Sequence, residues 1–257
     1  MWRSCLAVSL IACSCFVAGQ TQDLSAGVRE SNSPIPPQKF EPLSFEAKGD
    51  IFMARKMYRE AVETYLQTSP PSPVIYNKIG IAYHQMGDLN TAYKYYERSL
   101  KLKPDYAEAI NNMGTVQYSR KSYRRAISQY KKALKLSPDS ASILSNLGTA
   151  YFARKDYKHA SECYESALRI DPEVFEHRST QGVLLQERSV EERAKFHYFL
   201  AKTYAKAGRD ELALLYIRKS LEEGFKDRDK YLHDTEFDQL RKVPEFSDLM
   251  KLEPRVL

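Results

Sequence analysis

Few side chains in this sequence are of the kinds that act as nucleophiles, general bases or metal ligands. Among 257 residues there are five histidines, and no two of them stand four residues apart, the spacing that places two imidazoles on one helical face to bind zinc. Neither a glycine-rich phosphate loop nor a serine nucleophile elbow occurs. We therefore expect no catalytic residue, no metal and no cofactor. If the chain is an enzyme instead, His84 and His197 are the residues to test first, ahead of His159, His177 and His233.

The cysteines offer little chemistry either. Cys5, Cys13 and Cys15 fall in an apolar run near the start of the sequence, and Cys163 stands alone. If a leader that holds the first three is removed, the remaining thiol can form neither an intramolecular disulfide nor a cysteine-based metal site. A reactive cysteine needs an electropositive, partly exposed site. We expect Cys163 to serve packing.

One pattern occurs three times at an interval of 34 residues between about Pro73 and Val174. Each copy predicts two helices, because apolar residues recur at the i, i+3, i+7 spacing of one helical stripe and a proline then ends the pair. Gly87 is expected to be a left-handed helix stop, and Asp88, Ser122 and Asp156 are expected to be N-caps. The residues in step are Gly80, Gly114 and Gly148; Ala92, Ala126 and Ala160; Tyr96, Tyr130 and Tyr164; and Pro104, Pro138 and Pro172.

This 34-residue period with Gly, Ala, Tyr and Pro in order resembles the tetratricopeptide repeat. The resemblance implies an all-α fold, a right-handed α-solenoid of helix pairs with short capping helices at its C-terminal end. The interval from Gly49 to Gly80 is 31 residues, so the second helix of a divergent first pair should be short. Ser189 and Glu192 form a predicted capping box that opens the last pair.

These patterns divide the chain into four parts. We expect a signal peptide at 1–19, a flexible linker at 20–41, a five-repeat domain at 42–227 and capping helices at 228–257. The repeats are expected at 42–72, 73–106, 107–140, 141–174 and 194–227, with an insertion at 175–193.

The first residues read as a secretory signal. The apolar run from Cys5 to Ala18 is shorter than the ~20 residues of a membrane-spanning helix, and small residues precede a cut after Gly19. We therefore expect no transmembrane segment and an exported protein, periplasmic or secreted. Two alternatives stay open: a lipobox ending at Cys13, which would anchor a lipoprotein in the outer membrane, and a buried N-terminal helix.

The resemblance also implies where a partner would bind, because the first helices of such pairs line a concave groove. Asn112 and Asn146 stand one repeat apart, as in the amide ladder that holds peptides in some tetratricopeptide proteins, and an amide both donates and accepts hydrogen bonds. A protein or extended peptide is the expected partner; a merely capping or solvated role for these asparagines stays open. The groove residues are expected to be Asn77, His84, Asn111, Asn112, Thr115, Tyr118, Asn146, Thr149, Phe152 and Lys202.

A second use of the family does not fit. Tetratricopeptide domains that clamp a C-terminal carboxylate carry a Lys and an Asn in one repeat, an Asn in the next, and a Lys with an Arg in the third. Of the corresponding positions only Asn112 matches, and a clamp without cations cannot hold a carboxylate.

Basic residues are concentrated in one repeat. The chain has 39 Lys and Arg against 33 Asp and Glu, a net charge of +6, which falls to +5 if a leader containing Arg3 is removed. A solvated face is the expected explanation, followed by attraction to acidic partners or an anionic membrane; export argues against nucleic acid. We expect an exported, non-catalytic scaffold that helps an envelope or secreted complex assemble. The basic residues are Arg120, Lys121, Arg124, Arg125, Lys131, Lys132 and Lys135.

Overall fold

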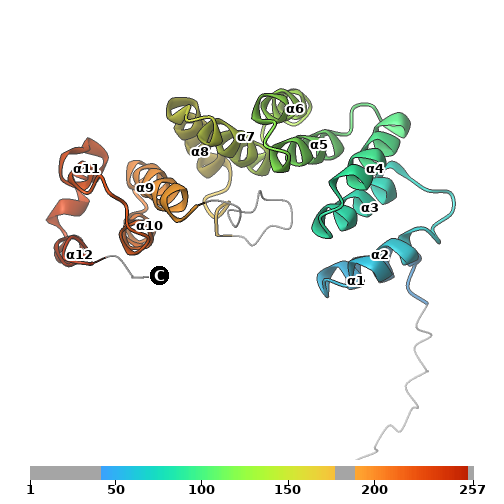
Figure 1. The fold of residues 1–257 in the computed structure, drawn as a ribbon, viewed down its shortest axis with the longest axis horizontal. Helices are drawn as coiled ribbons and strands as arrows, with labels where there is room; N and C mark the ends of the chain where they lie inside the picture. The colour runs from blue at the N-terminus through green and yellow to red at the C-terminus, as the bar shows by residue number, and fades with distance from the viewer. Residues whose placement is uncertain (1–41, 177–188, 254–257) are drawn as a thin grey trace, which may run out of the picture. The chain divides into compact units, whose positions relative to one another are not determined.

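The computed structural model describes residues 42–176 and 189–253, and every regular element within these ranges is a helix (Figure 1). The predicted signal peptide, the whole predicted linker and most of the insertion lie outside the described residues. Those three parts therefore stay predictions.

Ten of the described helices form five consecutive pairs. Each helix packs against its partner, and the second helix of one pair packs against the first helix of the next. This confirms the predicted all-α solenoid of helix pairs. The pairs are α1 (Phe45–Ala54) with α2 (Tyr58–Tyr65), α3 (Pro73–Gln85) with α4 (Leu89–Leu102), α5 (Ala107–Ser119) with α6 (Tyr123–Leu136), α7 (Ala141–Ala153) with α8 (Tyr157–Ile170), and α9 (Val190–Lys206) with α10 (Asp210–Glu222).

The helix ends follow the sequence signals. The carboxylate of Asp88 accepts a hydrogen bond from the Thr91 amide at 3.0 Å, and that of Asp156 accepts one from the His159 amide at 3.4 Å, as N-caps do. Ser122 also stands at an N-cap, but its side chain makes no capping bond. Helix α2 has 8 residues where α4 has 14, which is the shortening that the 31-residue interval predicts.

A left-handed residue lies in the turn inside every pair. It stands seven positions after the repeat glycine, or after Ala201 in the fifth pair. Gly87 (φ +81°) and Gly208 (φ +67°) occupy it in two pairs, which confirms the predicted stop at Gly87. In the other three the residue is Lys56 (φ 60°), Lys121 (φ 58°) or Lys155 (φ 63°), a conformation that residues with a Cβ rarely adopt.

The close approach of the two helices depends on a glycine that faces a buried tyrosine 16 residues later. A Cβ atom on any of these glycines would lie 2.3–2.7 Å from the tyrosine Cε1, and the rings cannot retreat because they are at most 1% exposed. In the fifth pair Ala201 stands at the glycine position and Ile217 at the tyrosine position, 16 residues apart. The alanine is larger than glycine, and the isoleucine is smaller than tyrosine. The glycine pairs are Gly49–Tyr65, Gly80–Tyr96, Gly114–Tyr130 and Gly148–Tyr164.

The fifth pair begins at the predicted capping box. The Glu192 amide donates to Ser189 Oγ at 3.2 Å, and the Ser189 amide donates to Glu192 Oε2 at 3.3 Å. Because this box sets the helix start, α9 begins at Val190, four residues before the range 194–227 and inside the range assigned to the insertion.

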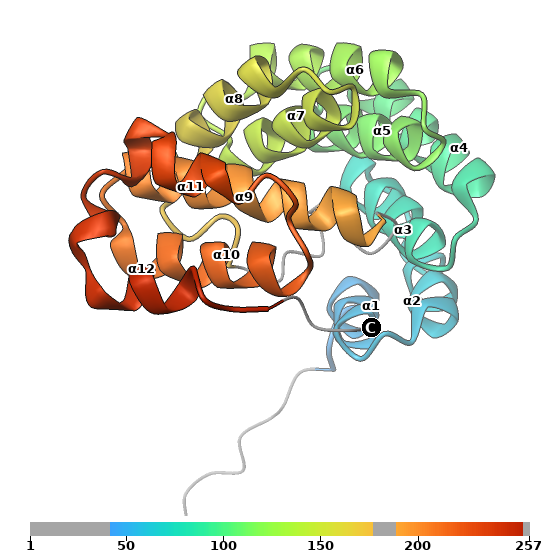
Figure 2. The ribbon, with the colours of Figure 1, turned by 60° about the vertical axis from the view of Figure 1, so that its left-hand side comes forward.

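Short helices cover the fifth pair at the C-terminal end. Helix α9 packs against η2, and α10 packs against α12 (Figure 2). The predicted capping helices are therefore present, and their buried apolar residues join the core of α9 and α10. The elements are α11 (Asp229–His233), η2 (Thr235–Phe237), η3 (Leu240–Lys242) and α12 (Pro244–Leu249), with Tyr231, Phe237, Leu240, Phe246 and Leu249 buried.

The glycine–tyrosine contact predicts a strong coupling in stability. Gly148→Ala gains about 1 kcal/mol of helix propensity but overpacks against Tyr164, at a cost of ~1–3 kcal/mol. We expect a net loss of unfolding free energy in urea titrations. In a Tyr164→Ile background, which copies the fifth pair, the same change should be neutral or stabilising. Additive effects of the two substitutions would contradict this account.

Candidate functional site

Buried asparagine amides connect the first helices of the three regular pairs. Asn112 Nδ2 on α5 donates to Asn77 Oδ1 on α3 at 3.0 Å, and Asn146 Nδ2 on α7 donates to Asn111 Oδ1 on α5 at 3.0 Å. Within α5 the amide of Asn111 donates to Asn112 Oδ1 at 3.3 Å. All four side chains are buried, between 1% and 7% exposed. The amides thus form one continuous hydrogen-bonded chain across three pairs.

The links of this chain obey one positional rule. A residue two positions before the glycine of one pair contacts the residue three positions before the glycine of the preceding pair. The same rule places Lys78 against Glu46, where Nζ and Oε1 form an ion pair at 2.7 Å. We call these contacts, Glu46–Lys78, Asn77–Asn112 and Asn111–Asn146, the polar seam.

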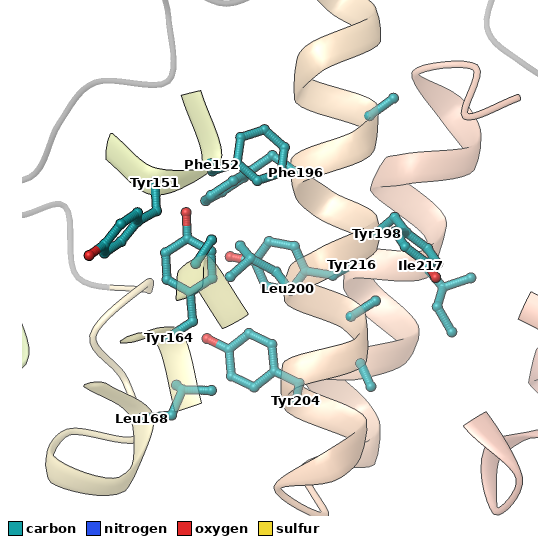
Figure 3. Packing of buried hydrophobic residues seen from close by; sticks show 14 of the residues in the cluster. Tyr151, Phe152, Tyr164, Leu168, Phe196, Tyr198, Leu200, Tyr204, Tyr216 and Ile217 are labelled. Atoms are coloured by element: carbon teal, nitrogen blue, oxygen red, sulfur yellow. The ribbon is translucent and has the colours of Figure 1, made fainter. Parts of the chain in front are cut away.

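The polar seam ends after α7. The rule would next join Ser145 to Phe199, which cannot hydrogen-bond through its side chain. Aromatic contacts replace the seam there: the Phe152 ring lies 5.5 Å from Phe196 and 5.7 Å from Phe199, and Tyr157 stacks on Phe199 at 4.9 Å between centroids. Figure 3 shows Phe152 and Phe196 beside each other at this junction.

The carboxylate of Glu176 adds to the same junction. Glu176 Oε1 accepts hydrogen bonds from the hydroxyls of Tyr204 at 3.2 Å and Tyr216 at 3.0 Å. Burial raises the pKa of both tyrosines, and the Glu176 charge adds to the increase. The fourth and fifth pairs are therefore joined by chemistry unlike that of the regular pairs.

Most of the residues predicted to face a groove have partners within the chain. Thr115 Oγ1 donates to the Asn111 carbonyl at 3.2 Å, and Thr149 accepts a bond from the Tyr164 hydroxyl at 3.4 Å. The sequence pattern led us to expect these residues on a groove surface and did not indicate that they are buried. Peptide binding by them stays a prediction. The buried members of the predicted set are Asn77, Asn111, Asn112, Thr115, Tyr118, Asn146, Thr149 and Phe152.

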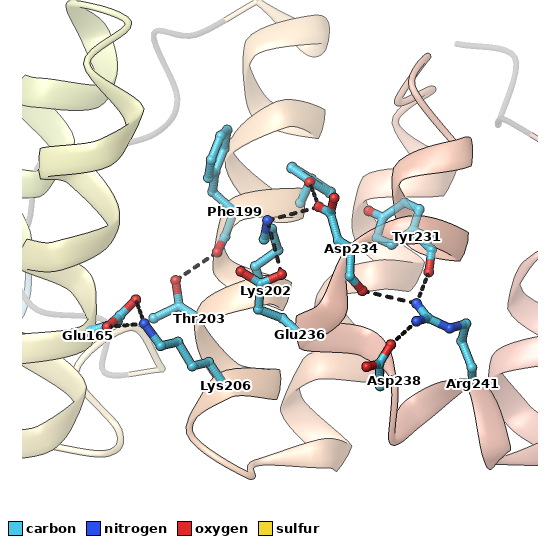
Figure 4. Close-up of polar contacts among 11 residues, drawn as sticks. Glu165, Phe199, Lys202, Thr203, Lys206, Tyr231, Asp234, Glu236, Asp238 and Arg241 are labelled. Atoms are coloured by element: carbon cyan, nitrogen blue, oxygen red, sulfur yellow. Dashed lines mark hydrogen bonds and ion pairs between the residues drawn. The ribbon is translucent and has the colours of Figure 1, made fainter.

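The remaining two, His84 and Lys202, are partly exposed but engaged. His84 Nε2 lies 3.3 Å from Ser119 Oγ on the next pair, and burial lowers its pKa. Lys202 Nζ forms ion pairs with Asp234 at 2.9 Å and Glu236 at 3.2 Å (Figure 4). In the structure Lys202 thus holds the C-terminal cap to α9.

The candidate catalytic groups do not come together as a reactive site. His197 Nδ1 lies 2.8 Å from Glu223 Oε2; burial lowers the pKa of His197, and Glu223 only partly opposes it. Burial raises the pKa of the Cys163 thiol to about 11, so the nucleophilic thiolate is disfavoured at neutral pH. Within the described ranges, no group of three His, Cys, Asp or Glu residues could hold a metal ion.

The described helices are also too short or too polar to cross a bilayer; among residues 42–176 and 189–253, no candidate span is found.

By its fold, this chain is an α-solenoid of stacked helix pairs. The tetratricopeptide repeat model matches residues 71–139 and 106–173. The matched residues span the three regular pairs, from α3 to α8. No curated protein matches the chain significantly.

Several solved structures are similar in fold. MamA (41-end) from Desulfovibrio magneticus RS-1 is 20% identical, with 70% of this chain and 92% of that chain covered and a TM-score of 0.47. YrrB, described as a TPR protein with an unusual peptide-binding site, is 20% identical over 51% of this chain and 69% of that chain, with a TM-score of 0.44. The APC/C hetero-tetramer Cut9-Hcn1 is 19% identical over 80% of this chain and 35% of that chain, with a TM-score of 0.51. At these identities the likeness concerns the fold alone.

The polar seam predicts an unequal cost of removing two asparagines. Asn111→Ala deprives buried Asn146 Nδ2 of its acceptor and buried Asn112 Oδ1 of its donor, so we expect a loss of about 1–3 kcal/mol in unfolding free energy. The control is Asn90→Ala, where an exposed amide bonded to Arg120 is lost and the expected change is within about 0.5 kcal/mol. Chemical denaturation measures both, and equal small losses would refute a structural role for the seam.

Proposed function

We propose that this chain is a non-catalytic scaffold that binds a segment of another protein along the first helices of its repeats. The observation that supports this proposal most is the polar seam, because buried bonds between α3, α5 and α7 fix these helices in register. Side chains beside the seam then repeat at a constant spacing, which suits an extended polypeptide with its own regular repeat. In this proposal the buried amides set the spacing.

The direct contacts come from half-buried residues on the same helices. Ile81 and His84 on α3, and Ser142 and Ser145 on α7, are all partly exposed. They combine an apolar side chain with small hydrogen-bonding groups, which can contact both the backbone and the side chains of a bound segment. The partner is thus proposed to be a protein or extended peptide rather than nucleic acid.

The enzyme alternative has weaker support. His84 lies on α3 and His197 on α9, and each already has a hydrogen-bond partner from its own surroundings. Turnover that disappears in His84→Ala or His197→Ala would restore this alternative.

We further propose that the scaffold acts outside the cytoplasm, in the periplasm or as a secreted protein, where it helps a complex assemble. The support is the apolar run that ends at Ala18. The alternative is an outer-membrane lipoprotein tethered through Cys13.

Mass spectrometry of the mature N-terminus tests the export proposal. We expect the purified protein from its native cell to begin at Gln20, because the small residues up to Gly19 suit the signal cleavage site. A diacyl or triacyl group on Cys13 would establish the lipoprotein instead. A chain that keeps Met1 would contradict both.

Photo-crosslinking tests the binding surface with two matched serines. A photoreactive amino acid replaces Ser142 on the first helix α7, or exposed Ser128 on the second helix α6. After illumination in the native cell, we expect a protein adduct from position 142 and none from position 128. Adducts from position 128 alone, or from neither position, would overturn the proposed surface.

A further inference from the structure

A hollow lined by cations lies where the turns of two successive repeats meet. It has a volume of about 510 Å³ and belongs to the turn before α6 and the turn before α8. Helices α6 and α7, which adjoin these turns, pack against each other. We call it the basic hollow, and its lining residues are Lys121, Ser122, Tyr123, Arg124, Arg125 and Arg154.

The charge of the basic hollow is uncompensated. Its four cations, Lys121, Arg124, Arg125 and Arg154, are exposed, and none forms an ion pair with a carboxylate in the described part of the chain. The charge of Arg154 contributes to lowering the pKa of Asp156. Its pKa is lowered first by the His159 hydrogen bond, however, and only weakly by Arg154.

Neighbouring cations are used differently. Arg120 donates to the Leu89 carbonyl at 3.3 Å and to Asn90 Oδ1 at 2.6 Å, and its guanidinium lies 5.4 Å from the Tyr93 ring centroid. One terminal nitrogen of the guanidinium, Nη2, therefore makes both hydrogen bonds. All four arginines are exposed, but Arg120 has hydrogen-bond partners on the preceding pair, whereas Arg124, Arg125 and Arg154 form no ion pair within the described residues.

The local backbone adds to the positive field. Helix α6 begins at Tyr123, and its N-cap Ser122 makes no side-chain bond to the first amides. The partial positive charge of a helix start attracts anions. It acts here together with the four side chains.

The shape of the site favours one class of ligand. Cations from two repeats are spread over an open space, which suits several carboxylates along a chain better than one compact ion. Arginine pairs with carboxylates through two parallel hydrogen bonds.

We propose that the basic hollow binds an acidic segment of a partner protein, whose Asp or Glu side chains pair with Arg124, Arg125 and Arg154. This surface is formed by the turns inside the helix pairs. It is therefore a second binding surface, separate from the first-helix surface proposed above, and either can operate without the other.

Fluorescence anisotropy with the full chain tests this proposal. The probe is a short labelled peptide in which Asp and Glu alternate with Ser and Gly, and the reference peptide carries Asn and Gln in place of the acids. We expect binding of the acidic peptide only, with an affinity that falls as salt is added. Arg124→Gln, Arg125→Gln and Arg154→Gln combined should weaken binding by about tenfold or more.

A matched variant removes the same amount of charge elsewhere. Lys226→Gln, Lys242→Gln and Lys251→Gln alter three exposed lysines near the C-terminal end and should leave the affinity within about twofold. All six positions are exposed, so both variants should fold, which circular dichroism checks.

Three results would overturn the proposal. One is the absence of binding to the acidic peptide, and another is an equal loss in both triple variants, which would indicate attraction to net charge alone. The third is binding of phosphatidylserine vesicles or single-stranded RNA in the absence of peptide binding, which would assign the hollow to a different class of ligand.

Discussion

The contact between a backbone without a side chain and a buried tyrosine ring is the constraint on which the rest of the structure depends. With Gly148 under Tyr164, the two helices of a pair approach more closely than any Cβ would allow. Close pairs leave little freedom in how the next pair stacks. The first helices then meet at fixed positions, and polar side chains can be placed there with hydrogen-bonding accuracy.

The contacts between pairs change in chemistry along the chain while keeping their position. An ion pair, Glu46 with Lys78, stands where asparagine amides stand in the next two links. Beyond α7 the position holds Phe199, and packing of aromatic rings takes over from hydrogen bonds. Directional bonds fix the register of the regular pairs, whereas ring packing and the Glu176 carboxylate join the fifth pair, which follows the insertion.

The sequence contained enough information for the helices and their ends. The 34-residue period, the capping box at Ser189 and the stop at Gly87 are local signals, and the structure agrees with them. The burial of Asn112 and Asn146 could not be predicted from local sequence signals. Their bonds run to residues 35 positions earlier, one more than the period, and this offset depends on how neighbouring pairs stack. Looking for polar residues two and three positions before each glycine would have found it.

The basic hollow was likewise visible in sequence only as a cluster of cations. Arg154 belongs to a different repeat from Arg124 and Arg125, and only the stacking of pairs brings them around one space. The side-chain contacts that distinguish Arg120 from these three are a property of the folded chain.

The left-handed lysines place a positive charge on the surface at the cost of an unfavourable backbone conformation. Gly87 and Gly208 prove that glycine is accepted at this turn, yet Lys56, Lys121 and Lys155 adopt the same conformation at roughly 1 kcal/mol each. Evolution or engineering toward heat resistance would favour glycine there. Each such replacement would also remove the positive charge of a lysine from the turn, and at position 121 it would remove one from the basic hollow. A more thermostable variant of this kind would therefore carry a lower positive charge.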